Sequence, residues 1–303
     1  MSSNFYGKDG FIWFTGVVED RNDPLQVSRV RVRCVGYHTQ DKTILPTADL
    51  PWASVMMPVT SPSMGGLGNT PSFLVEGTWV VGFFRDPDYQ EPIVMGSLPG
   101  IPDTAPNSSL GFNDPYATYP SELNVPDTSS LARGTQKYPQ NITNSIGIPV
   151  DPYGGVYPKN HVYETESGHL KEYDDTPNKE RIRERHKSGT YYEIHPNGDK
   201  VTHIVNDNYH IIAGNDSVQV KGNVTLNIDT NCITNIGGNW DVNVTGNVTI
   251  DGATINLNSG TKGAARIGDT ADTGDQGGGS DFDVNAAGTN KIETGSSTVF
   301  IGG

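Results

Sequence analysis

Between residues 220 and 251 the chain repeats one pattern every eight residues. The run reads VKGNVTLN, IDTNCITN, IGGNWDVN and VTGNVTID, so each block, or octad, opens with Val or Ile and has Asn in fourth place. The same register can be followed upstream, where Ile204 and Ile212 open earlier octads. What a repeat of this length can build is the strongest constraint on the fold.

Within an octad, apolar and polar residues alternate until a Gly-Asn or similar pair interrupts them. Alternation with a period of two is typical of a strand with one buried face, and Gly and Asn favour turns. We therefore expect a corner in each octad, formed by Gly198, Gly214, Gly222, Gly238, Gly246, Asn223, Asn231, Asn239 and Asn247. The apolar residues at positions five and seven are expected to fill an axis: Val224, Leu226, Cys232, Trp240, Val242, Val248 and Ile250.

Eight residues are too few to go round a core of their own. A single-chain β-solenoid needs on the order of 20 residues for each turn. Three chains that contribute eight each supply about 24, which is enough for one layer of a triangular prism. An ordinary antiparallel sheet with chance spacing is the alternative, but seven consecutive octads carry Asp or Asn at position four. The octads thus predict an intertwined trimeric β-helix, a long and stiff rod.

The first hundred residues predict a second kind of β-structure. Alternating segments such as FIWFTGVVE, SRVRVRCVGY, PWASVMM, TWVVGFF and PIVMGSL are separated by turn-forming residues. About five short strands of this kind suggest a small barrel. Arg29, Arg31 and Arg33 alternate on one of these segments, so we expect them on one strand face as a surface that docks a partner.

Two further regions complete the chain before the octads. Residues 101–160 are rich in Pro, Asn, Ser, Thr and Tyr and show no lasting hydrophobic period, which predicts an extended linker that either lies over a neighbour or joins two domains. Strand patterns resume at residue 161. The segment KERIRERHK has helical propensity, but we expect a strand because strands flank it.

Composition excludes several classes of function. The net charge of −14 argues against nucleic acid as a partner, because such proteins need a basic face for phosphates. Two cysteines, Cys34 and Cys232, form neither a disulfide framework nor a zinc motif. The N-terminal residues do not match a signal peptide and no apolar run is long enough to span a bilayer, so we expect assembly in a reducing cytoplasm.

These segments resemble a known family. The octads are similar to the triple-stranded β-helix of contractile-tail phage central spikes and of the related VgrG proteins of type VI secretion. The stretch ETESGHLKEYDDTPNKERIRERHKSGTYYEIHPNGDKV is similar to the entry of those needles. GVVEDRNDPLQVSRVRVR, LPWASVMMP and EGTWVVGFFRDPDYQEPIVMGSL resemble their OB-fold domain. The resemblance implies baseplate hub proteins as partners and brief contact with a host outer membrane.

The tail adds a second resemblance. KGAARIGDT and GSSTVFIGG are similar to the opening and closing phrases of PAAR tip proteins, which usually hold a metal through histidines and a cysteine. Here no histidine follows His210 and no cysteine follows Cys232, so we predict no metal and no other cofactor. The sequence leaves open whether a separate tip protein caps the point.

Some spikes of this family carry a lysozyme domain between barrel and needle, so a peptidoglycan hydrolase is one competing hypothesis. A glycosidase needs paired carboxylates in a folded cleft, and residues 101–160 are too short and irregular to supply one. A secretion-system spike and a receptor-binding tail fibre stalk are two more competing hypotheses. No phosphate loop, nucleophile elbow or HExxH motif is present.

Together these observations predict an all-β protein with four regions. Residues 1–100 form an OB-fold that docks on the hub, residues 101–160 a linker, residues 161–260 the β-helix needle, and residues 261–303 an abbreviated PAAR-like tip. The expected function is that of a homotrimeric, non-enzymatic spike in the tail baseplate of a virion, which pierces the host outer membrane mechanically.

Overall fold

The computed structural model describes residues 12–101, 103–116, 124–140 and 147–254. The predicted tip, residues 261–303, lies outside the described residues. All regular structure in the described part is β-structure apart from one short 3-10 helix, Thr47–Asp49. The prediction of an all-β fold is confirmed for the described residues, whereas the β-helix stays a prediction. No helix in the described part has the length and apolarity needed to cross a membrane.

The first five strands form a closed barrel in the order β1-β2-β3-β5-β4. Their bounds are Ile12–Asp20, Val30–Cys34, Trp52–Val55, Trp79–Phe84 and Pro92–Ser97 for β1 to β5. Neighbouring strands are antiparallel except β3 and β5, which are parallel, and β4 closes the barrel against β1. The five alternating segments of the sequence correspond to these five strands, so the prediction of a small barrel is confirmed.

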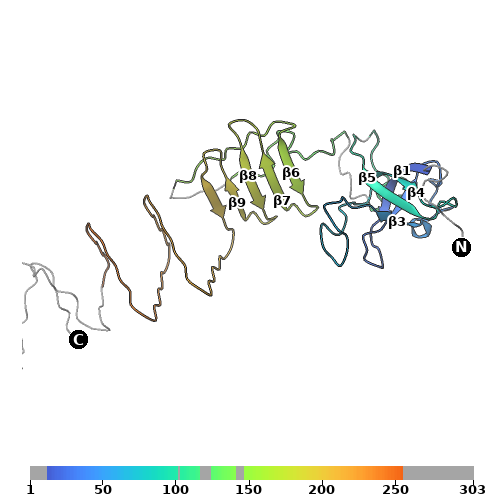
Figure 1. Ribbon diagram of the computed structural model, residues 1–303. Coiled ribbons are helices and arrows are strands. Elements are labelled where there is room, and N and C mark those ends of the chain that lie inside the picture. Colours follow the sequence, from blue (N-terminus) through green and yellow to red (C-terminus); the bar gives the residue numbers. More distant parts are fainter. Residues whose placement is uncertain (1–11, 102, 117–123, 141–146, 255–303) are drawn as a thin grey trace, which may run out of the picture. The chain divides into compact units, whose positions relative to one another are not determined.

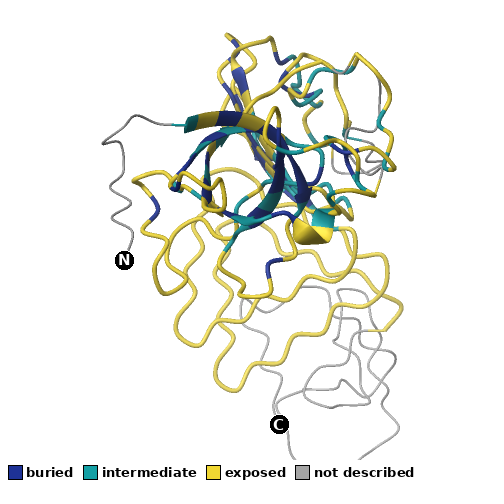
Figure 2. Ribbon diagram, turned by 90° about the vertical axis from the view of Figure 1, so that its right-hand side faces the viewer, coloured by how far each residue is buried: buried dark blue, intermediate teal, exposed yellow. Residues whose placement is uncertain are grey.

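Alternation decides which side chains fill the barrel. One core of small and medium apolar residues lies inside it, as the buried ring in Figure 2 shows: Phe14, Val18, Val30, Val32, Cys34, Ala53, Val80, Phe84 and Val94. Gly82 on β4 permits a close approach, because a Cβ there would lie 2.0 Å from the carbonyl oxygen of Ile93. The barrel therefore buries this apolar core within one chain.

A second, separate sheet begins at Asn160. Its five strands are consecutive antiparallel neighbours in the order β10-β9-β8-β7-β6 (Figure 1). Strands β6 to β10 span Asn160–Glu164, Leu170–Asp174, Arg181–Arg185, Tyr191–Ile194 and Lys200–His203. Gly168, Gly189 and Gly198 have φ values of 87°, 103° and 88° in three of the connecting turns, where a side chain would be strained. The segment KERIRERHK contains β8, which confirms the preference for a strand over a helix.

After β10 the chain contains no strand in the described residues, which extend to Thr254. The chain divides into two compact units between Asn227 and Ile228, within the octads. The barrel, the sheet and the first octads belong to the first unit, and the remaining described octads belong to the second.

Candidate functional site

The octads have a regular local geometry in the structure. The chain bends at positions two and three of every octad and runs straight through the other six positions. The bends fall at residues 205–206, 213–214, 221–222, 229–230, 237–238 and 245–246. Four predicted corner glycines, at positions 214, 222, 238 and 246, lie in these bends, and the asparagines at positions 223, 231, 239 and 247 begin the straight segments that follow. Gly198 lies instead in the turn between β9 and β10.

The bends do not require a left-handed backbone. Gly198 has a positive φ of 88°, whereas the glycines at positions 214, 222, 238 and 246 lie outside that region. Thr230 and Asn206 occupy the corresponding place in two octads, which is consistent with a bend that accepts a side chain. The backbone conformation of the bends therefore does not itself require glycine at these positions.

The residues predicted to fill an axis are uncovered in the single chain. Every residue from Val205 to Thr254 is exposed, Cys232 included. Val224, Leu226 and Trp240 each expose 75% of their surface. The exposed fractions are 58%, 61% and 70% for Val242, Val248 and Ile250. Burial of one such side chain stabilises a fold by roughly 1.5–3 kcal/mol. A single chain therefore does not gain the favourable free energy that burial of these side chains would provide.

The first residue of each octad is less exposed than the residues at positions five and seven. Val220, Ile228, Ile236 and Val244 expose between 45% and 51% of their surface, less than Val224 or Leu226. No strand pairs with residues 204–254 in the part of the chain that the structure describes, so their backbone is left without a ladder. Both the apolar side chains and the backbone of the octads are available to other chains.

The sheet before the octads has two unlike faces. On one face lie side chains that are charged and almost fully buried: Glu172 on β7, Arg181 and Arg183 on β8, and Glu193 on β9. Arg181 donates to Glu172 at 2.8 Å, and Nε2 of His195 lies 2.8 Å from Oε1 of Glu193. Burial lowers the pKa of Arg183, the main effect on that guanidinium. We call this the inner face of the sheet.

Residues of the predicted linker cover the inner face. Asp151 accepts a hydrogen bond from Arg181 at 2.9 Å, and the carbonyl oxygen of Tyr138 accepts one from Arg183 at 2.9 Å. Leu131 is fully buried, and its carbonyl oxygen accepts hydrogen bonds from Tyr153 and from the amide of Asn160. Residues 129–140 and 147–159 thus contribute a cover for the inner face, and sequence periodicity could not place it there because this segment is irregular.

The three arginines predicted to dock a partner have different environments. Arg33 is fully buried, where it donates to both carboxylate oxygens of Glu19 at 2.8 and 3.0 Å and to two loop carbonyls. The backbone amide of Phe112, from the linker, donates to the same Glu19 carboxylate. Arg33 therefore does not lie on a docking surface, because nearby loops cover the outside of the barrel at this place.

Arg29 and Arg31 are partly exposed and lie against Trp52, with guanidinium carbons 5.5 and 4.6 Å from the ring centroid. Arg29 also donates to Asp23 at 2.7 Å, and this contact holds the pKa of Asp23 well below its ordinary value of 3.8. Asp23 in turn accepts hydrogen bonds from the backbone of Leu25 and Val27. Both arginines are engaged within the barrel, and a docking role for them stays a prediction.

No group of three or more His, Cys, Asp or Glu side chains suited to a metal ion occurs among the residues that the structure describes. Cys34 is buried in the barrel core, and burial raises the pKa of its thiol to about 12. Such a thiol is a poor nucleophile at neutral pH.

Comparison with known proteins gives a consistent picture. The family described as the Gp5 N-terminal OB domain matches residues 36–186, a range that begins after β2 and extends to β8. The chain is 40% identical to Protein Gp5 of Vibrio phage KVP40 over 74% of its own length and 65% of that protein. It is 46% identical to the pre-baseplate central spike protein Gp5 of Enterobacteria phage T4 over 40% of its own length and 22% of that protein. The chain thus spans less than two thirds of either relative.

Proposed function

We propose that the chain is the central spike of a contractile phage tail baseplate, and its similarity to two phage Gp5 proteins and to the Gp5 N-terminal OB domain supports this proposal. One observation carries the proposal beyond the relationship. The octads place a regular series of apolar side chains at positions five and seven, and the single chain covers none of them. A segment of this kind needs partners, and identical copies in the same register supply them most simply.

The proposed assembly is a homotrimer in which three octad segments wind around one another as a triple-stranded β-helix. Each chain contributes one side of every triangular layer, and the bends at positions two and three form the corners. Val224, Leu226, Trp240, Val242, Val248 and Ile250 then meet along the axis, with Cys232 among them as a buried thiol. Hydrogen bonds between chains satisfy the backbone and leave no long sheet edge exposed.

The proposed action is mechanical. A rod that is hydrogen-bonded across three chains resists bending, so it can transmit a compressive force from the contracting tail to the host outer membrane. The barrel is proposed to dock on baseplate hub proteins, and residues 261–303 to form the point, alone or beneath a separate tip protein. Assembly is proposed to take place in the host cytoplasm before the spike joins the virion. No catalytic group or cofactor takes part in this action.

Two competing functions lie close to this proposal. A spike of a secretion system would share the trimer and the octads, and a spike with retained peptidoglycan hydrolase activity would share the barrel. The net charge of −14 is consistent with either and opposes nucleic acid as a partner. Clearing of a peptidoglycan suspension by the purified protein would favour the hydrolase, and we expect no clearing. A tail fibre stalk would bind intact host cells stably, which a piercing spike does not require.

The oligomeric state tests the proposal. Light scattering of the full chain should give a mass of about 98 kDa, three times 32.6 kDa. An unheated sample should keep a trimeric band in SDS, because intertwined chains separate slowly. A monomer of 32.6 kDa would remove both the β-helix and the mechanical action.

A further inference from the structure

The charges on the inner face of the sheet do not balance. The face and its cover hold four carboxylates and two guanidinium groups, those of Asp151, Glu172, Asp174, Glu193, Arg181 and Arg183. Ion pairs of 2.8 to 3.8 Å join three of the carboxylates to the two arginines, and Asp174 is the one left out. Asp174 is only 3% exposed, and a buried charge without a partner is costly. A protonated His195 would not remove this cost, because it lies against Glu193.

The side chain of Asp174 has one satisfied and one unsatisfied oxygen. Its Oδ1 accepts a hydrogen bond from the backbone amide of Thr176 at 2.9 Å, whereas its Oδ2 is buried and has no hydrogen-bond partner among the described residues. Because the other buried carboxylates of this face are paired with arginines, Oδ2 of Asp174 is the place where a positive group is missing.

A second unsatisfied acceptor lies beside Asp174. The register of β6 and β7 places Asn160 directly opposite Asp174. The amide nitrogen of Asn160 donates to the carbonyl oxygen of Leu131 at 3.2 Å and to the carboxylate of Glu172 at 2.7 Å. Both partners are acceptors, so they fix the orientation of the amide. The amide oxygen of Asn160 is buried and has no hydrogen-bond partner in the described part of the chain. Two neighbouring acceptors thus lack a donor or a cation.

The cover leaves a glycine at this place. A Cβ on Gly155 would lie 2.8 Å from Nδ2 of Asn160 and 3.2 Å from Oδ2 of Asp174, so both side chains reach the same point. Gly155 is itself buried. A larger residue at position 155 would fill the space beside the two side chains, and glycine keeps it open.

We propose that Oδ2 of Asp174 and Oδ1 of Asn160 bind a divalent cation such as Ca²⁺, with water completing its coordination. Carboxylate, amide carbonyl and water oxygens are the ligands that Ca²⁺ takes, and it accepts them in flexible geometry. With His195 neutral, the four carboxylates exceed the two guanidinium groups by two charges, which one divalent ion cancels. A water molecule would satisfy both oxygens but would leave the charge.

This site differs from the metal sites considered above. It uses one carboxylate and one amide, and so does not need three His, Cys, Asp or Glu side chains, a group that the described residues lack. Sequence spacing could not reveal it, because Gly155, Asn160 and Asp174 meet only in the fold. The bound ion would fasten the cover at Gly155 to β6 and β7. The site lies within one chain, so it is independent of the proposed trimer.

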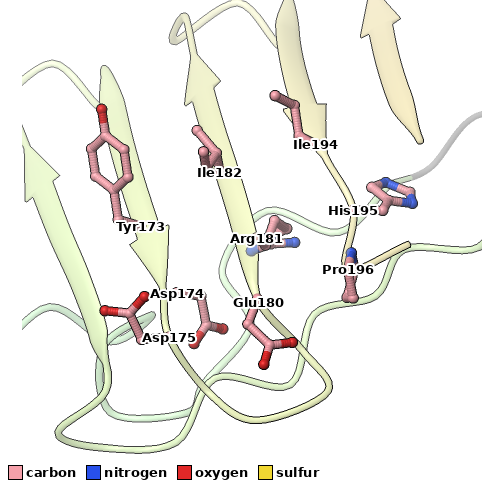
Figure 3. Close-up of a pocket in the computed structure, with 9 residues that line it drawn as sticks. All are labelled: Tyr173, Asp174, Asp175, Glu180, Arg181, Ile182, Ile194, His195 and Pro196. Atoms are coloured by element: carbon pink, nitrogen blue, oxygen red, sulfur yellow. The ribbon is translucent and has the colours of Figure 1, made fainter. Parts of the chain in front are cut away.

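Calcium binding by the full chain tests the site. The protein is treated with EDTA, and bound calcium is then measured by equilibrium dialysis over a range of calcium concentrations. Asp174→Asn removes the charge and keeps the shape of the side chain. Asp175→Asn is the matched control, because its side chain is 76% exposed and Figure 3 shows the two carboxylates pointing to opposite sides at the end of β7. Gly155→Ala fills the space without changing any charge.

We expect about one calcium ion per chain in the parent and in Asp175→Asn. Binding to Asp174→Asn and to Gly155→Ala should be at least about tenfold weaker, since even a substitution outside the ligand set has this effect on metal sites. Calcium should also slow the cleavage by trypsin after Lys159, the residue before Asn160, because the bound ion opposes local opening.

Two results would overturn the site. A parent protein that binds no calcium leaves water as the occupant, and equal binding by the parent and Asp174→Asn places the ion elsewhere. Light scattering on the same samples separates this inference from the proposed function. A monomeric parent that loses calcium in Asp174→Asn would overturn the trimer and uphold the cation site, and a trimer without calcium would do the reverse.

Discussion

The barrel and the octads are both built from short alternating strands, yet they use the alternation in opposite ways. The barrel closes on itself and buries nine apolar residues within one chain. The octads repeat a similar apolar pattern over about fifty residues and bury none of them. The difference is one of closure, because β4 returns to pair with β1 whereas the chain after residue 204 pairs with no strand in the described part.

The sheet between these regions shares features of both. Its inner face is covered by residues 129–140 and 147–159 of the same chain, as in a self-sufficient domain. Its other face exposes Tyr163, Tyr173 and Ile182, as the octads expose their apolar side chains. Along the chain, the share of apolar side chains that the single chain buries therefore falls from the barrel to the octads.

The largest expected effect is on the octads. Val242→Asp places a carboxylate at a predicted axial position, where three copies would bring three charges together without partners, at a cost of several kcal/mol each. We expect the mass in light scattering to fall from about 98 kDa to the monomer value of 32.6 kDa. Asn243→Asp adds the same charge one residue further on the opposite side of the strand and should remain trimeric. An unchanged mass for Val242→Asp would show that this side chain does not face an axis.

The next effect concerns two ion pairs of the barrel that differ in burial. Arg33 and Glu19 are fully buried, whereas Arg85 and Glu91 have side chains that are 41% and 50% exposed. Arg33→Met leaves an uncompensated carboxylate and should lower the free energy of unfolding by about 3–5 kcal/mol. Arg85→Met should lower it by about 1 kcal/mol or less. Urea unfolding measures both values.

The double variant Arg33→Met with Glu19→Met serves as the control for that comparison. Removal of both charges should recover much of the loss, because the penalty comes from the unpaired charge. If Arg33→Met and Arg85→Met lower the free energy of unfolding equally, burial does not determine how much the Arg33–Glu19 pair contributes to stability.

Thiol labelling compares the barrel, which holds Cys34, with the octads, which hold Cys232. Cys34 is buried and the pKa of its thiol is raised to about 12, so it should resist alkylation until the barrel unfolds. Cys232 is exposed in a single chain and should become protected only in the trimer. We expect no rapidly labelled thiol in the native protein and one per chain in Val242→Asp. Rapid labelling of Cys232 in a native trimer would place it outside the axis.

The smallest effect concerns a loop of the barrel. Arg29 keeps the pKa of Asp23 below its ordinary value of 3.8, so the folded state favours the ionised carboxyl. A lowered pKa contributes stability above pH 3.8, and this contribution is lost as the pH falls towards the folded-state pKa. Asp23→Asn should therefore lower the free energy of unfolding at neutral pH and by less in acid below pH 3. A pH-independent difference between the two proteins would show that the charge of Asp23 is not responsible.

The local sequence pattern was sufficient to predict most of the secondary structure of the described residues. Each alternating segment of the first hundred residues became one barrel strand, and the strand context of KERIRERHK outweighed its helical propensity. The period of eight also located the bends, which recur in every described octad. These features depend on residues close in sequence, so one sequence is enough to find them.

Features that depend on distant residues were not predictable in this way. Alternation placed Arg31 and Arg33 on the outside of β2, but the loop carbonyls of Thr39 and Leu45 and the amide of Phe112 enclose Arg33 and its partner Glu19. The charged inner face of the second sheet was missed for the same reason. Its cover begins some thirty residues before the sheet in a segment without periodicity, and only the fold brings the two together.

The constant spacing of the bends has a consequence for how the length of such a protein can change. Adjacent strands of a sheet lie about 4.8 Å apart, so each octad of the proposed trimer adds about that much length. Duplication or loss of one octad keeps every remaining side chain on its own side. An insertion of seven or nine residues would instead turn the following apolar positions outward. Selection can therefore adjust the reach of this segment in discrete steps by copying a stretch of 24 nucleotides, without redesigning any contact.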